Sequence, residues 1–353
     1  MLILEYIWLD CNNNPRSKTK VMKKDLKYES KKDILSSLPL WNFDGSSTGQ
    51  ATTEESEIIL KPIKCVSDPF RRDKFCYLVL CECLNINMMP NKFNTRYSAN
   101  KIFINNKEHK PLFGIEQEFF ISCYNKNNEK DLLVLEPACF SNKNVCLKEQ
   151  GDYYCGVGFN NALGRNIIED AFKNLLYAEL NITGLNAEVA PSQWEFQVCS
   201  TGIDAADSLI LTRYICDRTF EQYNCIMDLD VKPRKELNGS GCHVNFSTKE
   251  MRNSDGYNKI EKAIKNLEKN HILHIKHYGS DNDKRLTGLH ETSSIDEFSY
   301  GVGSRNTSIR IPNDTFKNKC GYLEDRRPSS TMDPYVVTSL LYATSCDLKH
   351  EFS

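Results

Sequence analysis

Two glutamates at close spacing mark the first stretch in which we expect chemistry. Glu116 and Glu118 lie in the sequence GIEQEF, residues 114–119. Side chains two apart on a β-strand share a face, so both carboxylates point the same way. Crowded like charges destabilise a fold, and a bound cation offsets that cost. The alternative is an exposed sheet face on which each glutamate has a lysine partner.

A second acidic stretch, NAEVAPSQWEFQ at residues 186–197, predicts two strands joined by a tight turn. A turn centred on Pro191 and Ser192 places Glu188 directly opposite Glu195, with Cβ atoms about 5 Å apart. Two such carboxylate pairs in one chain indicate a cation between them. Carboxylate oxygens favour Mg²⁺ or Mn²⁺ over Zn²⁺.

Further along, a glycine-rich turn leads into an alternating strand, NGSGCHVNFST at residues 238–248. His243, Asn245 and Ser247 fall on one face of this strand. Such an aligned polar face lines a polar site, or else it consists of hydrogen-bonded core residues.

Arginines accumulate after this strand, at positions 285, 305, 310 and 326, and Arg326 shares a strand face with Glu324. Guanidinium groups bind carboxylates and phosphates in bidentate fashion, although surface ion pairing is the alternative. The chain has no Gly-x4-Gly-Lys-Ser/Thr loop. Carboxylates, divalent metals and arginines without that loop suit phosphoryl transfer from a nucleotide.

The N-terminal region contributes a different kind of segment. Strands are predicted at residues 1–10 and 75–84, and between them lies WNFDGSST, residues 41–48, which we expect to be a loop. Trp41 and Phe43 are costly to leave in water, so this loop must dock. Asp44 and Ser47 have either a functional role or an ordinary role in a turn.

The composition is that of an ordinary globular chain, with 353 residues, 40% hydrophobic and 26% charged, and a formal net charge of -2. We therefore expect neither nucleic acid nor a membrane as partner, and no apolar run reaches the roughly 18 residues of a membrane span. Fifteen scattered cysteines indicate reduced thiols in a cytoplasmic protein.

We place a domain boundary near residue 95, which gives domains 1–95 and 96–353. Helices are expected near 97–108, 161–180, 204–223 and 257–276, and a last one begins at Asp333 and Pro334. His271, His274 and His277 resemble a metal cluster, but no carboxylate is interleaved. A helix-end or surface position is the better interpretation of these histidines.

The chain closely resembles glutamine synthetase of the eukaryotic type. The resemblance runs from Glu5 to about Thr344, so it covers nearly the whole chain. It is carried by the stretches named above and by three more: YYCGVG at 153–158, RLTGLHETS at 285–293 and GYLEDRRPS at 321–329.

The resemblance implies roles for individual residues. Ligands of a first metal would be Glu118, Glu188 and Glu195. Ligands of a second metal would be Glu116, His243 and Glu324. The glutamate site would contain Asn238, Gly239, Arg285 and Arg326. Residues facing ATP would be Arg305, Arg310, Asn245, Ser247, Arg252 and Tyr322. Asp44 would take a proton from ammonium, and Glu291 would belong to a flap, with Ser47 and Tyr154 in the same latch.

The fold so implied is α+β, with a small N-terminal β-grasp domain before a larger catalytic domain built on a curved antiparallel sheet with flanking helices. Family members of this type form two stacked pentameric rings, with each site between subunits. A homodecamer is therefore expected, and Trp41 and Phe43 would be buried at an interface. The chain departs from the family in lacking an N-terminal helical arm and in having Leu237 where an aromatic residue is usual.

The expected activity is ATP-dependent ligation of ammonia to L-glutamate through γ-glutamyl phosphate, with at least two Mg²⁺ or Mn²⁺ ions per site. One alternative is a related γ-glutamyl ligase that uses a larger amine. Another is a non-catalytic, ring-forming structural or sensing homologue, which should have lost site residues. The sequence keeps all six metal positions and all four arginines.

Overall fold

A computed structural model describes the chain except for residues 24–30, 125–129, 133–150, 159, 236 and 353. The chain forms two compact units. The first comprises residues 1–101 with 173–180, and the second comprises residues 102–172 with 181–353. Within the described residues, no helix has the length and apolar character needed to cross a membrane.

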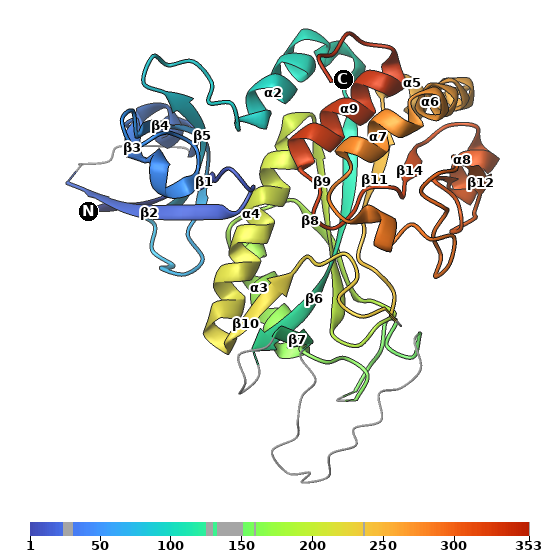
Figure 1. The fold of residues 1–353 in the computed structure, drawn as a ribbon, viewed down its shortest axis with the longest axis horizontal. Helices are drawn as coiled ribbons and strands as arrows, with labels where there is room; N and C mark the ends of the chain where they lie inside the picture. Colours follow the sequence, from blue (N-terminus) through green and yellow to red (C-terminus); the bar gives the residue numbers. More distant parts are fainter. Residues whose placement is uncertain (24–30, 125–129, 133–150, 159, 236, 353) are drawn as a thin grey trace. The chain divides into compact units, whose positions relative to one another are not determined.

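The first unit contains a five-stranded sheet in the order β2-β1-β5-β4-β3 (Figure 1). Its strands are β1 (Leu2–Leu9), β2 (Pro15–Met22), β3 (Trp41–Asp44), β4 (Glu57–Ser67) and β5 (Cys76–Asn85). β1 and β5 pair in parallel, and the other pairs are antiparallel. The short helix α1 (Lys31–Ser37) contacts β4. This sheet and its helix confirm the expected β-grasp domain.

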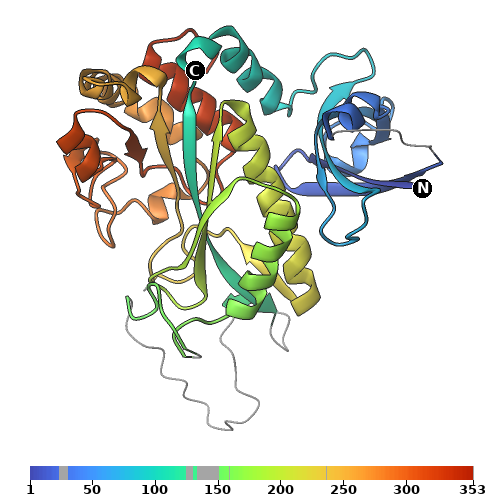
Figure 2. The ribbon, with the colours of Figure 1, turned by 180° about the vertical axis from the view of Figure 1, so that it is seen from behind.

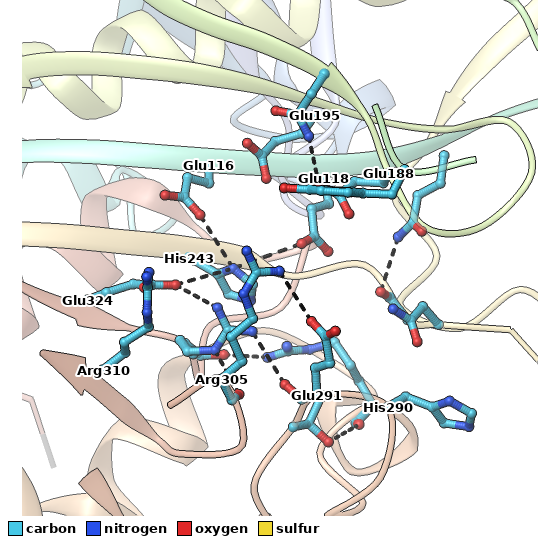
Figure 3. A pocket seen from close by; sticks show the side chains of 18 of the residues that line it. Glu116, Glu118, Glu188, Glu195, His243, His290, Glu291, Arg305, Arg310 and Glu324 are labelled. Atoms are coloured by element: carbon cyan, nitrogen blue, oxygen red, sulfur yellow. Dashed lines mark hydrogen bonds and ion pairs between the residues drawn. The ribbon is translucent and has the colours of Figure 1, made fainter. Parts of the chain in front are cut away.

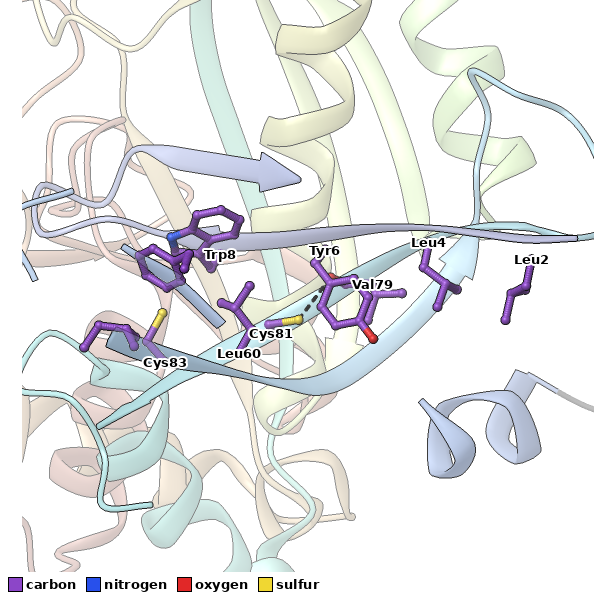
Figure 4. Packing of buried hydrophobic residues seen from close by; sticks show 10 residues of the cluster. Leu2, Leu4, Tyr6, Trp8, Leu60, Val79, Cys81 and Cys83 are labelled. Atoms are coloured by element: carbon purple, nitrogen blue, oxygen red, sulfur yellow. Dashed lines mark hydrogen bonds between the residues drawn. The ribbon is translucent and has the colours of Figure 1, made fainter. Parts of the chain in front are cut away.

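Alternation along β1 builds the core of this domain (Figure 4). Leu2, Leu4, Tyr6 and Trp8 all point to the same buried side of the sheet. They pack with Leu60 and Val79, and with the thiols of Cys81 and Cys83, from the neighbouring strands. The apolar period of two therefore fixes which face of the sheet is buried.

The 41–48 segment differs from the expected loop, because its first half is strand β3 and its second half is the 3₁₀ turn η1 (Gly45–Thr48). Phe43 faces the core of its own domain, where its ring centroid lies 4.5 Å from that of Trp8. Trp41 packs edge-on against Tyr6 and lies under the ammonium of Lys18. Phe43 is only 9% exposed in the single chain, so its burial requires no second subunit.

The second unit is organised on a nine-stranded sheet whose main path is β12-β13-β14-β11-β6-β9-β8, with β7 and β10 also paired to β6 (Figures 1 and 2). Its strands are β6 (Leu112–Tyr124), β7 (Lys130–Leu132), β8 (Ile182–Ala187), β9 (Gln193–Thr201), β10 (Cys225–Asp228), β11 (Cys242–Ser247), β12 (Tyr300–Val302), β13 (Ile309–Ile311) and β14 (Leu323–Asp325). The pairing is antiparallel throughout except between β12 and β13. The expected α+β class is confirmed, with a sheet that is mixed at one edge.

The helices predicted near 97–108, 161–180, 204–223 and 257–276 and after Asp333 are present, whereas the short helices at 31–37, 249–252 and 313–318 were not predicted. Besides α1, the described helices are α2 (Thr95–Asn105), α3 (Arg165–Tyr177), α4 (Ile203–Phe220), α5 (Lys249–Arg252), α6 (Tyr257–Lys269), α7 (His271–His277), α8 (Asn313–Asn318) and α9 (Pro334–Cys346), with 3₁₀ turns η2 (Lys107–His109), η3 (Glu221–Tyr223) and η4 (Asn282–Lys284). Helix α4 packs against β6, β9 and β10, and against α9. The helix expected at 257–276 is broken at Asn270, and Asp333 caps α9 as predicted.

The three histidines of α7 correct one interpretation, because two of them are core residues. His274 is fully buried between the hydroxyls of Tyr278 and Thr344. His271 contacts the carbonyl of Ile295 and the guanidinium of Arg327. Desolvation lowers the pKa of both imidazoles, so they are held neutral. The surface interpretation was wrong for these two residues.

Candidate active site

Strand register brings the predicted acidic residues to one cavity (Figure 3). On β6, Glu116 and Glu118 face the cavity while Ile115, Gln117 and Phe119 are buried on the other face. His243 on β11 is the register partner of Glu116. On the opposite side of β6, Glu195 on β9 is the partner of Glu118. The period-two interpretation of the sequence is therefore confirmed for β6 and β11.

The pairing predicted for the second acidic stretch was wrong. Glu195 lies opposite Asn186, and the amide of Glu188 donates to the carbonyl of Gln193. The turn is centred one residue earlier than expected, and Ser192 follows it with a left-handed φ of 59°. The carboxylates of Glu188 and Glu195 nevertheless lie close together, because Glu188 projects from the turn toward Glu118 and Glu195.

The first cluster consists of Glu118, Glu188 and Glu195, whose nearest ligand atoms lie within 4.8 Å of one another. Neutral donors hold one oxygen of each carboxylate. The Gly241 amide donates to Glu118 at 2.6 Å, the Asn186 side chain to Glu188 at 2.8 Å and the Gln197 side chain to Glu195 at 2.7 Å. The second oxygen of Glu188 also accepts from the Val189 amide, at 3.3 Å, so Glu188, like the other two carboxylates, is held by neutral donors.

These three carboxyls are under electrostatic stress. Burial is the largest cause in each case, and repulsion from neighbouring glutamates adds to it. Together they raise the pKa of Glu118 to about 8, that of Glu188 to about 7 and that of Glu195 to about 9. Ordinary glutamates titrate near 4.5. Such a group binds either protons or a cation near neutral pH.

The second cluster consists of Glu116, His243 and Glu324, also within 4.8 Å. His243 Nδ1 lies 3.6 Å from a Glu116 oxygen and 3.9 Å from a Glu324 oxygen. Desolvation, reinforced by the nearby guanidinium of Arg326, holds the pKa of His243 well below its usual range. The imidazole is therefore neutral, which is the form that binds a metal.

The hydrogen-bond donors to Glu324 are charged, whereas the donor to Glu116 is neutral. Arg310 donates to one oxygen of Glu324 at 2.7 Å, and Arg326 donates to the other at 2.6 Å. Asn245 donates to Glu116 at 2.7 Å. Glu324 is thus fully paired with guanidinium groups, unlike any carboxylate of the first cluster.

The donor chemistry of both clusters fits divalent cations. Five carboxylates and one imidazole converge without a thiol, a combination suited to hard ions that prefer oxygen ligands. The pKa values of the first cluster stay raised although Arg285, Arg326 and Arg305 act to lower them, so these arginines do not offset the burial and mutual repulsion of its carboxylates. A bound cation removes that stress.

Four arginines complete the cavity wall. Arg285 is 3% exposed and fixed by three backbone carbonyls, those of residues 326–328, and by the side chain of Asn282. Burial lowers its pKa to about 10, so it stays protonated at neutral pH. Arg305 pairs with Glu291 at 3.4 Å, and the Tyr154 hydroxyl, its largest influence, raises the pKa of Arg305.

The segment that carries Glu291 has an unusual backbone. Gly288, His290 and Glu291 all have positive φ values, of 78°, 52° and 60°. Left-handed conformations are unfavourable for residues with a Cβ atom and gather at functional sites. Glu291 is half-exposed at the edge of the cavity, held through Arg305 and, at its carbonyl, by Arg326.

Some predicted site residues do not line this cavity. Asn245 contacts it only through Glu116, and Arg252 pairs with Ser247 at 2.9 Å outside it. Tyr322 is 42% exposed. Partial burial is the main cause that raises the pKa of its hydroxyl, and the nearby charge of Glu116 raises that pKa further. Asp44 and Ser47 belong to the first unit, where the Ser47 hydroxyl donates to the Asp44 carboxylate at 2.9 Å.

Sequence reasoning also missed residues that line the cavity. They are Asn186, Gln193, Gln197, His290 and Thr292. Alternation contained a signal for two of them, because Gln193 and Gln197 flank Glu195 at a spacing of two. His290 and Thr292 flank Glu291, and only the backbone reversal at this loop turns them to the cavity.

Comparison with known proteins identifies the family. Residues 1–86 match the model of the glutamine synthetase β-grasp domain, and residues 94–272 match that of the glutamine synthetase catalytic domain. A glutamine synthetase of Saccharomyces cerevisiae is 47% identical over 348 residues, covering 98% of this chain and 89% of its own length. A putative glutamine synthetase of Acanthamoeba polyphaga mimivirus is 45% identical, covering 98% of this chain and 94% of its own length.

Among solved structures, a cryo-EM structure of Plasmodium falciparum glutamine synthetase superposes with a TM-score of 0.76. It covers 98% of this chain and 72% of its own, at 18% identity, so it supports the fold. Taken with the near full-length relatives, these matches mean that the chain belongs to the glutamine synthetase family and is a glutamate–ammonia ligase that makes glutamine with ATP and divalent metal ions.

Proposed function

We propose that the two clusters hold two divalent ions, Mg²⁺ or Mn²⁺, at the centre of the reaction. Glu118, Glu188 and Glu195 bind the first ion, and Glu116, His243 and Glu324 bind the second. The observation that carries this proposal is the convergence of both clusters on one arginine-lined cavity. The cavity, of about 170 Å³, is smaller than a drug-sized pocket of roughly 300–1,000 Å³, so it suits the reacting groups and not a whole nucleotide.

Arg285 and Arg326 are the proposed partners of the glutamate α-carboxylate, beside the loop of Asn238 and Gly239. Backbone carbonyls hold Nη2 of Arg285 and the Asn282 side chain holds its Nε, so the guanidinium is fixed in place and would meet a carboxylate through Nη1. Arg326 would release the carboxylate of Glu324 and bind the α-carboxylate of the substrate instead. Both arginines line the cavity and lie near Glu118, whose charge acts on each of them.

In the first chemical step, the glutamate γ-carboxylate attacks the γ-phosphorus of ATP, and γ-glutamyl phosphate forms as ADP leaves. Bound divalent ions would polarise the phosphoryl oxygens and neutralise charge. Arg305 and Arg310 stabilise the charge that develops on the transferred group. Ser247, Arg252, Tyr322 and Asn245 would border the rest of the nucleotide.

In the second step, ammonia attacks the acyl carbon and phosphate leaves. Asp44 is the proposed acceptor of the ammonium proton. Hydrogen bonds from Ser46 and Ser47 lower its pKa, so it is a carboxylate at neutral pH and attracts the ammonium ion. Glu291, with Ser47 and Tyr154, would close over the intermediate and exclude water.

The remaining expectations stand as proposals. We place the domain boundary near residue 95, and we propose a homodecamer of two pentameric rings, in which the N-terminal domain of one subunit caps the catalytic domain of the next. The cytoplasmic location suggested by the cysteine pattern stays a prediction. The names of the relatives favour ammonia over a larger amine as the second substrate.

Glu291→Ala tests the role of the flap. We expect the variant to fold and bind ATP but to release more phosphate than glutamine, because water reaches the intermediate. Glutamine and phosphate are measured in the same reaction. Glu297→Ala, at an exposed glutamate six residues later, is the matched control. Near-normal ligation by Glu291→Ala, with equal amounts of both products, would remove Glu291 from this role.

A further inference from the structure

Gln193 lies where the first cluster meets the proposed glutamate loop. It is the first residue of β9 and only 2% exposed, yet it lines the cavity. Its backbone closes the turn that carries Glu188. The Gln193 carbonyl accepts from the Glu188 amide at 2.8 Å, and the Gln193 amide donates to the carbonyl of Ala190. The position of Glu188 therefore depends on Gln193.

The side chain of Gln193 reaches the other way. Its Nε2 group donates to the carbonyl of Gly239 at 3.1 Å and to the hydroxyl of Ser240 at 3.2 Å. Its Oε1 atom accepts from the amide of Ala190 at 3.3 Å. Both hydrogens of the carboxamide have acceptors in the 239–240 loop, and the carbonyl oxygen returns to the 188–193 turn. One side chain thus bridges the two segments.

The 239–240 loop has little freedom to reach this position by other means. A Cβ atom on Gly239 would lie 2.5 Å from the carbonyl of Val231 and 2.7 Å from Cγ of Arg285. The backbone bonds of Ser240, to Val231 and Ser330, fix that residue and not the preceding carbonyl. In the part of the chain that the structure describes, the hydrogen bond to the Gly239 carbonyl comes from Gln193.

We propose that Gln193 is a positioning residue that couples the first metal cluster to the glutamate-binding loop. The inference rests on the proposed roles of Gly239 and Glu188. A cation that fixes Glu188 also fixes the turn, and the turn holds the loop through the Gln193 carboxamide. Glutamate then binds to a loop that is already ordered, whereas the proposed ATP contacts of Arg305, Arg310 and Tyr322 lie outside both segments and are unaffected.

Gln193→Met tests the proposal because it keeps the length of the side chain and removes every polar contact. Loss of such buried hydrogen bonds corresponds to an affinity for glutamate that is about tenfold lower. We expect KM for glutamate to rise about tenfold, with KM for ATP and the Mn²⁺ dissociation constant within about twofold of wild type. In wild type, saturating Mn²⁺ should tighten glutamate binding, and this effect should disappear in Gln193→Met.

Ser240→Ala provides a second, smaller perturbation from the other side of the same bond, and it guards against a Gln193 variant that fails to fold. It should shift KM for glutamate in the same direction. Asn181→Met is the matched control, since Asn181 makes an amide–hydroxyl bond to Ser200 at the far end of the same hairpin. It should leave both KM values unchanged.

Three results would overturn the coupling. The first is an unchanged KM for glutamate in Gln193→Met. The second is an equal increase in the KM for glutamate and the KM for ATP, with a lowered Tm. The third is an effect of Mn²⁺ on glutamate binding that survives the substitution. Wild type is measured first. Absence of glutamate-dependent turnover in wild type would contradict the proposed function itself, which separates that failure from a failure of the role of Gln193.

Discussion

The two carboxylate clusters share one cavity but differ in what holds their oxygens. In the first cluster, the donors are neutral: the backbone amides of Gly241 and Val189 and the carboxamides of Asn186 and Gln197. In the second, Arg310 and Arg326 occupy both oxygens of Glu324. Neutral donors orient a carboxylate without repelling a cation, whereas a guanidinium competes with it. The first cluster is thus ready for a cation, and the second becomes ready when anionic substrates attract its arginines.

The largest effect is expected from Glu195→Gln, which removes one ligand of the first cluster. Loss of a partner outside a ligand set costs about 10–100-fold in metal affinity, so loss of the ligand itself should exceed roughly 100-fold. The Tm of the metal-free protein should rise at a pH above about 9, where Glu195 is ionised, because a buried like charge is removed. Titration with Mn²⁺ followed by Tm measures both. A lowered metal-free Tm would mean that Glu195 is not under electrostatic stress.

The next effect is the pH dependence of metal binding. Because their pKa values are raised, Glu118, Glu188 and Glu195 make their full contribution to the stability of the metal-free fold below about pH 4.5, and that contribution is lost as the pH rises through about 7 to 9. A cation must displace those protons. With one proton displaced, affinity for Mn²⁺ should rise roughly 100-fold from pH 6 to pH 8. Calorimetry in buffers of different ionisation enthalpy counts the released protons. Zero release would contradict the raised pKa values of the three glutamates.

Arg310→Met should sharpen the contrast between the clusters. Without its guanidinium, one oxygen of Glu324 is released, so the second cluster should bind Mn²⁺ about tenfold more tightly in the absence of ATP. Turnover should nevertheless fall, because the phosphates lose a partner. Mn²⁺ binding is followed by electron paramagnetic resonance. If Arg310→Met weakens metal binding without ATP, the arginine supports the cation and does not compete with it.

The smallest effect is expected from Asn186→Ala, which removes the carboxamide on Glu188 and leaves all ligands present. A loss of about tenfold or less in Mn²⁺ affinity should follow, with the ATP KM unchanged. Asn181→Ala is the control, because Asn181 directly precedes β8 and does not line the cavity. An effect equal to that of Glu195→Gln would show that Asn186 is itself a ligand.

Local periodicity explains which parts of this site could be predicted. Alternation placed Glu116 and Glu118 on one face and aligned His243 with Asn245. The register of the β8–β9 hairpin could not be obtained in this way, because a left-handed Ser192 shifts the turn by one residue. The same limit applies to Phe43, whose burial depends on the ring of Trp8 from a distant strand.

Contacts between residues far apart in the chain could not be predicted from the sequence either. Arg310 lies on β13 and Arg326 directly follows β14, and only the β13–β14 pairing brings Arg310 opposite Glu324. Gln193 could be placed near Glu195 by spacing, but its bond to Gly239 links residues 46 positions apart. Similarly, His274 needed the packing of α7 against α9 to become a core residue.

The most direct test of the account measures γ-glutamyl hydroxamate formation from glutamate, ATP and hydroxylamine. Wild type and Glu195→Gln are compared with Mg²⁺, with Mn²⁺ and after chelation, and a reaction without glutamate is the blank. We expect glutamate-dependent product from wild type with either metal, and none after chelation or from Glu195→Gln. Product that persists in Glu195→Gln at wild-type rates would contradict the central role given to the first cluster.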